Sequence, residues 1–200
     1  MAMRTFVAGI VGGIAMFLWT SIAHLALPLG EAGIREIPNE KLVLSTLEQN
    51  AGNESTLYLF PGLGVGPNPS REQRNEAMKH IAEKYSAGPS GLLMYHPPGR
   101  PLNFSKWLVI EFATELVEAI LAVWLLAQTR LIRFGSRVGF VTIIGVIAAI
   151  ATNISYWNWY GFPTVYTASY ILTEIIGFLC VGLVAAIIFR NRSFEDPPRA

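Results

Sequence analysis

The sequence contains one cysteine and few charged residues. Only 14% of its 200 residues are charged, whereas 52% are hydrophobic. Because Cys180 is the sole cysteine, an intramolecular disulfide is excluded. The net charge is +1 and no basic patch stands out, which argues against a nucleic-acid partner.

Motifs typical of common enzymes are also missing. The sequence has no G-x-S-x-G, no H-E-x-x-H and no phosphate-binding glycine loop. Residues 62–66 contain three glycines, but no lysine follows them and two prolines come next. These absences favour a non-catalytic protein that requires no cofactor, although a membrane enzyme of another type stays open.

The charges are clustered, and four long apolar segments lie between the clusters. Each is near the length of about 20 residues that a helix needs to cross a bilayer. The sequence therefore predicts an all-α membrane protein with four transmembrane helices and a small extracytoplasmic α/β cap between the first two. The predicted spans are residues 5–27, 104–129, 138–155 and 164–189. The predicted parts are an N-terminal tail with the first helix (1–27), the cap (28–103), a bundle of three helices (104–192) and a tail (193–200).

The first segment has two alternative interpretations. Ser21-Ile22-Ala23 is a tolerable cleavage site, so the segment could be a signal peptide. Its apolar run is longer than the roughly 7–15 residues usual for a signal peptide, which favours an uncleaved anchor. Gly9 and Gly13 form a G-x-x-x-G step that predicts close helix packing, unless these are glycines of the kind that membrane helices generally tolerate.

Within the cap, the sequence predicts two helices and two strands. Asn39 is the expected N-cap of a helix over residues 40–49. Ser70 and Gln73 form a capping box for a helix that runs to about Ser86. Residues 56–60 and 91–96 are β-like runs, and they could pair as a small ribbon that needs packing against helices.

The short connections carry the basic residues, which predicts the orientation. By the positive-inside rule both termini face the cytoplasm and residues 28–103 lie outside. In a bacterium this arrangement corresponds to an inner-membrane protein with a periplasmic loop. The basic residues on the cytoplasmic side are Arg4, Arg130, Arg133, Arg137, Arg190, Arg192 and Arg199.

Aromatic residues cluster where the second, third and fourth spans reach the outer side. Amphipathic rings favour the boundary between bilayer and water, so these residues predict an interfacial aromatic belt. A site that stacks a ligand or contacts a pigment is the alternative. The belt comprises Trp107, Tyr156, Trp157, Trp159 and Tyr160.

The second span carries an acidic stripe. Glu111, Glu115 and Glu118 are spaced by four and then three residues, which places them on one helix face. With about 1.5 Å of rise per residue, Glu174 of the fourth span lies at the depth of Glu115. The predicted intramembrane polar cluster comprises His24, Glu111, Glu115, Glu118, Asn153, Tyr170 and Glu174.

Three uses of this cluster are open. Neutral or paired glutamates could hold helices together, or the cluster could pass protons or bind a cation along a hydrated path. The third possible use is metal binding, with His24, Glu111 and Glu115 as candidate ligands. The metal interpretation lacks the Glu-x-x-His steps of di-iron bundles, and His80 and His96 are expected to be ordinary histidines of the loop.

Four short stretches resemble a group of bacterial four-helix integral membrane proteins to which no activity is assigned. They are Leu27–Glu31, Pro38–Glu40, Phe60–Gly62 and Gly91–Pro97, all in the outer segment. The resemblance covers less than half of the chain and implies a shared architecture, but no function.

Together these features predict a non-catalytic integral membrane subunit. Its expected partners are the lipid bilayer and a larger respiratory, photosynthetic or transport complex, or copies of itself. The alternative is an intramembrane protein that handles protons, a cation or a metal, using the acidic stripe with Glu174 and His24.

Overall fold

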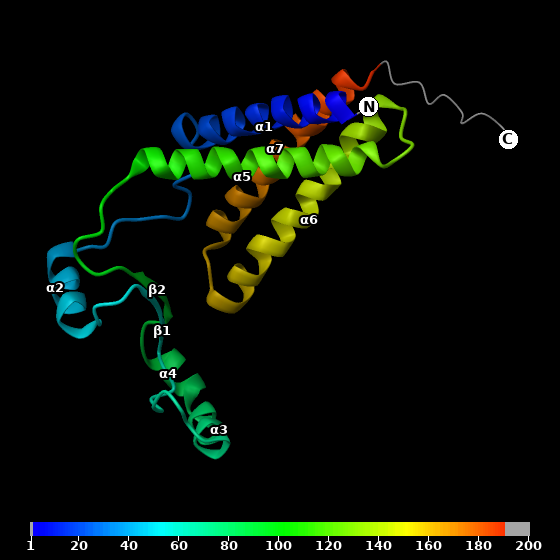
Figure 1. The fold of residues 1–200 in the computed structure, drawn as a ribbon. Coiled ribbons are helices and arrows are strands. Elements are labelled where there is room, and N and C mark those ends of the chain that lie inside the picture. Colours follow the sequence, from blue (N-terminus) through cyan, green and yellow to red (C-terminus); the bar gives the residue numbers. More distant parts are fainter. Residues whose placement is uncertain (1, 191–200) are drawn as a thin grey trace. The chain divides into compact units, whose positions relative to one another are not determined.

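A computed structural model describes residues 2–190 as a mostly helical chain with one two-stranded sheet (Figure 1). The chain divides into two compact units. The helical unit joins the described residues up to Arg35 with those from Asn103 onward, and the loop unit is Glu36–Leu102. The predicted tail, residues 193–200, lies outside the described part of the chain.

The helical unit contains four long helices. Length and composition show that three of them can cross a membrane: α1 (Ala2–Leu25), α6 (Phe134–Tyr160) and α7 (Thr164–Ile188). The fourth helix, α5 (Phe104–Ala127), has the same 24-residue length as α1, but it carries the three glutamates of the acidic stripe. The structure thus shows three candidate spans where the sequence predicts four.

Helix α1 packs against both α5 and α7, and α6 packs mainly on α7. Figure 1 shows α5 and α6 diverging from the short connection between them, which agrees with their limited contact. Small residues allow these close approaches. Gly9 and Gly13 of α1 lie against the backbone of α5, where an added Cβ would come 2.8 Å from the Cα atoms of Ile120 and Leu116.

Apolar side chains and one buried arginine stabilise the end of the helical unit where α6 begins and α7 finishes. Val123, Val141 and Val181 belong to its core. Arg137 is buried there, and its guanidinium donates hydrogen bonds to the carbonyls of Leu131 and Phe189. Arg137 thus links the segment before α6 to the C-terminal end of α7, where cationic groups are favourable.

The two ends of α6 differ most from the prediction. Helix α6 begins at Phe134 and runs to Tyr160, whereas a span of 138–155 is expected from the sequence. Consequently, the aromatic residues from Tyr156 to Tyr160 form the last turns of a helix and not a connection. Gly161, with φ +68°, ends this helix in the left-handed conformation that glycine readily adopts.

The loop unit contains α2 (Glu40–Asn50), β1 (Thr56–Phe60), α3 (Arg71–Lys79), α4 (Ile81–Ala87) and β2 (Gly91–Tyr95). The strands pair antiparallel, which confirms the expected ribbon. Ser70 and Gln73 form the predicted capping box. The single helix expected up to about Ser86 is wrong, because the backbone at His80 adopts φ −98° and ψ 0° and separates α3 from α4.

Asn39 occupies the N-cap position of α2 as expected, but its side chain makes no capping hydrogen bond. Its backbone is left-handed, with φ 56° and ψ 41°. Asparagine tolerates this conformation better than most residues do. Asn39 therefore contributes a change of chain direction before α2 and not the predicted cap.

Candidate functional site

The acidic stripe of α5 meets α1 at Glu115. This carboxyl group is the most deeply buried of the stripe, since only 4% of Glu115 is exposed. It interacts with the Thr20 side chain of α1, while its Oε2 atom is buried without a hydrogen-bond partner among the described residues. Because α1 and α5 are antiparallel and side chains lean toward their own helix N-terminus, these two side chains approach each other.

The next carboxyl along the stripe faces α7. Glu118 is half-buried and interacts electrostatically with Glu174 of α7. Two donors of α6 meet the same oxygen of Glu174, Thr152 through Oγ1 and Asn153 through Nδ2, each at 3.5 Å from Oε2. These are long hydrogen bonds. Three helices therefore contribute to this part of the site.

Toward the C-terminal end of α1 and the N-terminal end of α7, two tyrosines and a histidine follow. The rings of Tyr166 and Tyr170, one turn apart on α7, have centroids separated by 4.4 Å. His24 of α1 meets Tyr170 edge-on at 6.2 Å. Glu111 is exposed and interacts electrostatically with Tyr170 and with the other two glutamates of the stripe.

His24 is fixed by local contacts. Its Nδ1 atom lies 2.9 Å from the Thr20 carbonyl oxygen, which can only accept, so Nδ1 carries the hydrogen. This leaves Nε2 as the nitrogen that is available to the site. Gly30 packs on the ring so closely that an added Cβ would lie 2.3 Å from Cδ2. The turn after α1 therefore holds the imidazole in place.

Each residue of the sequence-predicted cluster interacts with at least one other member, and four helices contribute. We name the acidic-polar site by these residues: Thr20, His24, Glu111, Glu115, Glu118, Thr152, Asn153, Tyr170 and Glu174. Among residues 2–190, no group of three or more His, Cys, Asp or Glu side chains is arranged to hold a metal ion. The candidate ligands His24, Glu111 and Glu115 thus interact without forming such a group.

The aromatic residues expected at the interface lie at two helix ends. Tyr156, Trp157, Trp159 and Tyr160 are exposed in the last turns of α6, and Trp107 is exposed in the first turn of α5. The Trp157 indole donates a hydrogen bond of 3.1 Å to Thr164 Oγ1 at the start of α7.

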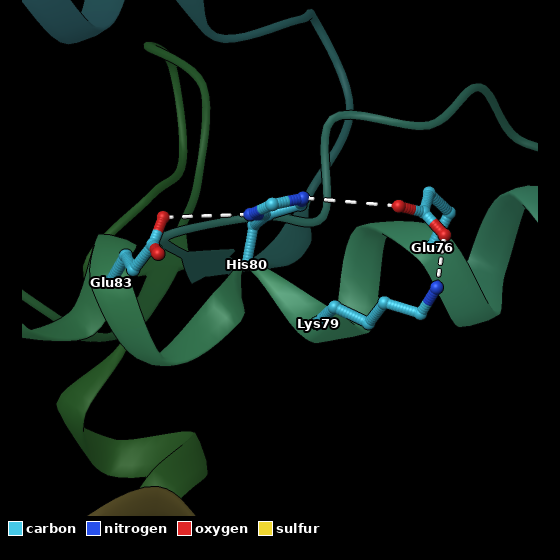
Figure 2. A network of polar contacts seen from close by, with 4 residues as sticks. All are labelled: Glu76, Lys79, His80 and Glu83. Atoms are coloured by element: carbon cyan, nitrogen blue, oxygen red, sulfur yellow. Dashed lines mark hydrogen bonds and ion pairs between the residues drawn. The ribbon is translucent and has the colours of Figure 1, made fainter.

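A second cluster of titratable groups lies in the loop unit. Figure 2 shows His80 between Glu76 and Glu83, with Lys79 also on Glu76. The His80 nitrogens lie 3.9 Å from Glu76 and 3.5 Å from Glu83, and all these side chains are more than half exposed. Exposed ion pairs of this kind contribute little to stability. The network is a solvated surface of α3 and α4.

Sequence reasoning missed Thr20 and Thr152 as members of the acidic-polar site. The position of each in the sequence gave a signal: Thr20 lies one turn before His24, and Thr152 directly precedes Asn153. A threonine in an apolar helix usually bonds its own backbone, as Thr152 does to Ala148, so the signal was weak.

No known protein family matches the chain, and neither the curated proteins nor the solved structures yield a significant match.

Proposed function

We propose that the chain is an integral membrane protein in which α5 forms a fourth span and the acidic-polar site reversibly binds protons. The observation that carries this proposal is the electrostatic interaction of Glu118 on α5 with Glu174 on α7, together with the hydrogen bonds of Thr152 and Asn153 of α6 to the Glu174 carboxyl. Ionisable residues inside membranes are costly and mark proton or ion sites.

The packing of α5 supports its assignment as a span. A charged side chain at the bilayer centre costs about 2.5–3.5 kcal/mol on insertion scales. Two of the three carboxyl groups of α5 are withdrawn from the surrounding medium by packing: Glu115 is buried beside α1, and Glu118 is half-buried. The apolar residues Val117, Leu121 and Trp124 are exposed elsewhere on the helix, as a lipid-facing surface requires.

Protons fit this arrangement better than a multivalent metal. A metal ion needs several ligands that converge on one point, whereas protons bind carboxyl groups one at a time. The site offers carboxyl groups as neighbours, with hydroxyl and amide groups that can accept or donate hydrogen bonds. The test must distinguish proton binding from the binding of a monovalent cation that competes for the same carboxylates.

The basic residues support an orientation with both termini in the cytoplasm. Arg130 and Arg133 lie in the connection between α5 and α6, and Arg190 follows α7. This is the positive side by the positive-inside rule. The proposed location is the bacterial inner membrane, with the loop unit on the extracytoplasmic side.

The test is infrared difference spectroscopy of the protein in liposomes between acidic and alkaline pH. Protonated carboxyl groups have a carbonyl stretching band that carboxylates lack. We expect bands that titrate reversibly, and the loss of one band in Glu118→Gln and in Glu174→Gln. Glu40→Gln on α2, which is outside the site, is the matched control and should leave the bands of Glu118 and Glu174 unchanged.

Spectra of the two site variants that equal the wild-type spectrum would overturn proton binding by this pair. If sodium ions remove the bands at fixed pH whereas a large organic cation does not, the site exchanges protons for a cation. Retention of the elution profile in Glu118→Gln and Glu174→Gln shows that a lost band reflects the carboxyl group and not unfolding.

A second function is favoured by the exposed position of Glu111. This carboxyl group is not covered by the described helices, and α5 has little contact with α6. An additional helix from a larger complex, or from a second copy, could lie there, and the protein would then be a non-catalytic accessory subunit. Extraction in mild detergent followed by mass measurement tests this, since a lone monomer would contradict it.

A further inference from the structure

The ribbon of the loop unit has one face that is entirely aliphatic. Neither strand contains a charged residue. The register pairs Leu57 with Met94 and Leu59 with Leu92, so these side chains project on the same side. We call this set the aliphatic face: Leu57, Leu59, Leu92 and Met94.

The two faces of the ribbon differ in how the unit covers them. On the opposite face, Tyr95 is only 9% exposed and its ring lies 6.1 Å from that of Tyr58. The Tyr58 hydroxyl also accepts a hydrogen bond of 3.1 Å from the Gly52 amide. On the aliphatic face, Leu57 is 57% exposed and Met94 is 70% exposed.

The charged residues of the loop unit lie outside its two strands. Helices α3 and α4 carry alternating basic and acidic side chains that are exposed, including the network of Figure 2. A two-stranded ribbon is marginal in water unless an apolar face is covered. The unit therefore has a surface that favours water and another that favours an apolar medium.

We infer that the aliphatic face inserts into the outer leaflet of the bilayer that the long helices cross. The loop unit is joined to α1 through residues 26–35 and precedes α5, so the chain itself tethers it to the long helices. Tethering gives lipid a high effective concentration, and a weak apolar surface is then sufficient for binding. Lipid also requires no charge complementarity, which fits a face without charges.

The geometry of the ribbon limits how deeply it can insert. The outer edges of β1 and β2 have unpaired backbone groups, because the sheet consists of these two strands. Such groups need water or headgroups and are excluded from the hydrocarbon core. The aliphatic face therefore lies at the boundary between headgroups and acyl chains, as interfacial anchors do. This inference depends on membrane insertion, and not on proton binding.

The experiment places a fluorescent label at single cysteines of the full chain in a Cys180→Ala background. Met94→Cys and Leu57→Cys report on the aliphatic face, and Glu72→Cys on α3 is the matched control. The protein is reconstituted into vesicles of phosphatidylethanolamine and phosphatidylglycerol. Quenching is measured with lipids that carry a shallow spin label and with iodide in water.

We expect lipid quenching at Met94 and Leu57 to exceed that at Glu72 several-fold, and iodide quenching to be several-fold weaker. Iodide quenching as strong at Met94 as at Glu72 would overturn the proposal, because the face would then lie in water. Protection from both quenchers would also overturn it, since a protein surface would then cover the face. Unchanged circular dichroism of each variant excludes misfolding as the cause.

Discussion

Replacing Gly145 with alanine should push α6 and α7 apart. An added Cβ would lie 2.5 Å from the Cβ of Phe178 and 2.7 Å from its Cγ. Carbon atoms in contact are separated by about 3.5–4.0 Å, so the two helices must separate by roughly 1 Å or more. The Phe178 ring cannot relieve the clash by rotating, because its Cβ moves only with the backbone of α7.

The magnitude follows from two opposing terms. Overpacking of this kind destabilises by about 1–3 kcal/mol. Exchanging glycine for alanine inside a helix contributes about 0.5–1 kcal/mol in the other direction. Gly139 on the same helix has no atom within 4 Å of an added Cβ, so Gly139→Ala reports the second term alone. The free energies of unfolding of the two variants should therefore differ by about 1–3 kcal/mol.

The assay is reversible unfolding by sodium dodecyl sulfate in mixed micelles, followed by circular dichroism. Gly145→Ala should unfold at a lower detergent fraction than the wild type or Gly139→Ala. Equal midpoints for the two variants would refute the close approach of α6 and α7. A double mutant with Phe178→Gly separates sterics from other causes, because removing the Cβ together with the ring removes the clash and should make the effects of the two substitutions non-additive.

Two further predictions test other contacts. Gly13→Ala would place its Cβ 2.8 Å from the Leu116 Cα atom, so the same titration should show a loss of about 1–3 kcal/mol, and a midpoint like that of Gly139→Ala would contradict the packing of α1 on α5. Ser70→Ala removes the 3.1 Å bond from the Gln73 amide and should weaken α3 by about 0.5–2 kcal/mol, seen as faster hydrogen exchange of α3 amides with unchanged exchange in α7.

The long helices follow from the sequence, but their ends do not. Hydropathy marks where a segment is apolar, and it correctly locates α1, α6 and α7. It ends the third span at about Ser155, because the next residues are Tyr156, Trp157 and Asn158. The helix continues through them, since aromatic residues are compatible with a helix and the terminating left-handed residue is Gly161.

Local chemistry was likewise sufficient for part of the loop unit. The capping box at Ser70 depends on residues three positions apart and the two strands on short β-like runs, and the structure confirms them. The break at His80 carries no proline or glycine, so nothing in the sequence distinguishes it from a continuous helix. It arises from the backbone conformation of one residue within an otherwise helical charge pattern.

The site shows where reasoning from spacing reaches its limit. Spacing predicts that the carboxyl groups of α5 share one side of that helix, but it cannot name their partners, because those contacts join distant segments. Equal depth suggested that Glu174 lies level with Glu115, whereas its interaction is with Glu118. Depth counting assumes parallel helix axes, and α5 and α7 cross at an angle in Figure 1.

The glycines of α1 decide which carboxyl of the stripe is buried. Because Gly9 and Gly13 bring α1 against the backbone of α5, the surface of α1 covers Glu115. Gly12 and Gly177 also bring α1 close to α7, where an added Cβ would lie 3.1 Å from side-chain atoms of Val181 and Met16. Helix α1 therefore fixes the positions of α5 and α7 relative to each other. Widening either contact should change the separation of Glu118 and Glu174 without altering a single polar residue, so the helix-packing glycines and the proposed proton site belong to one structural unit.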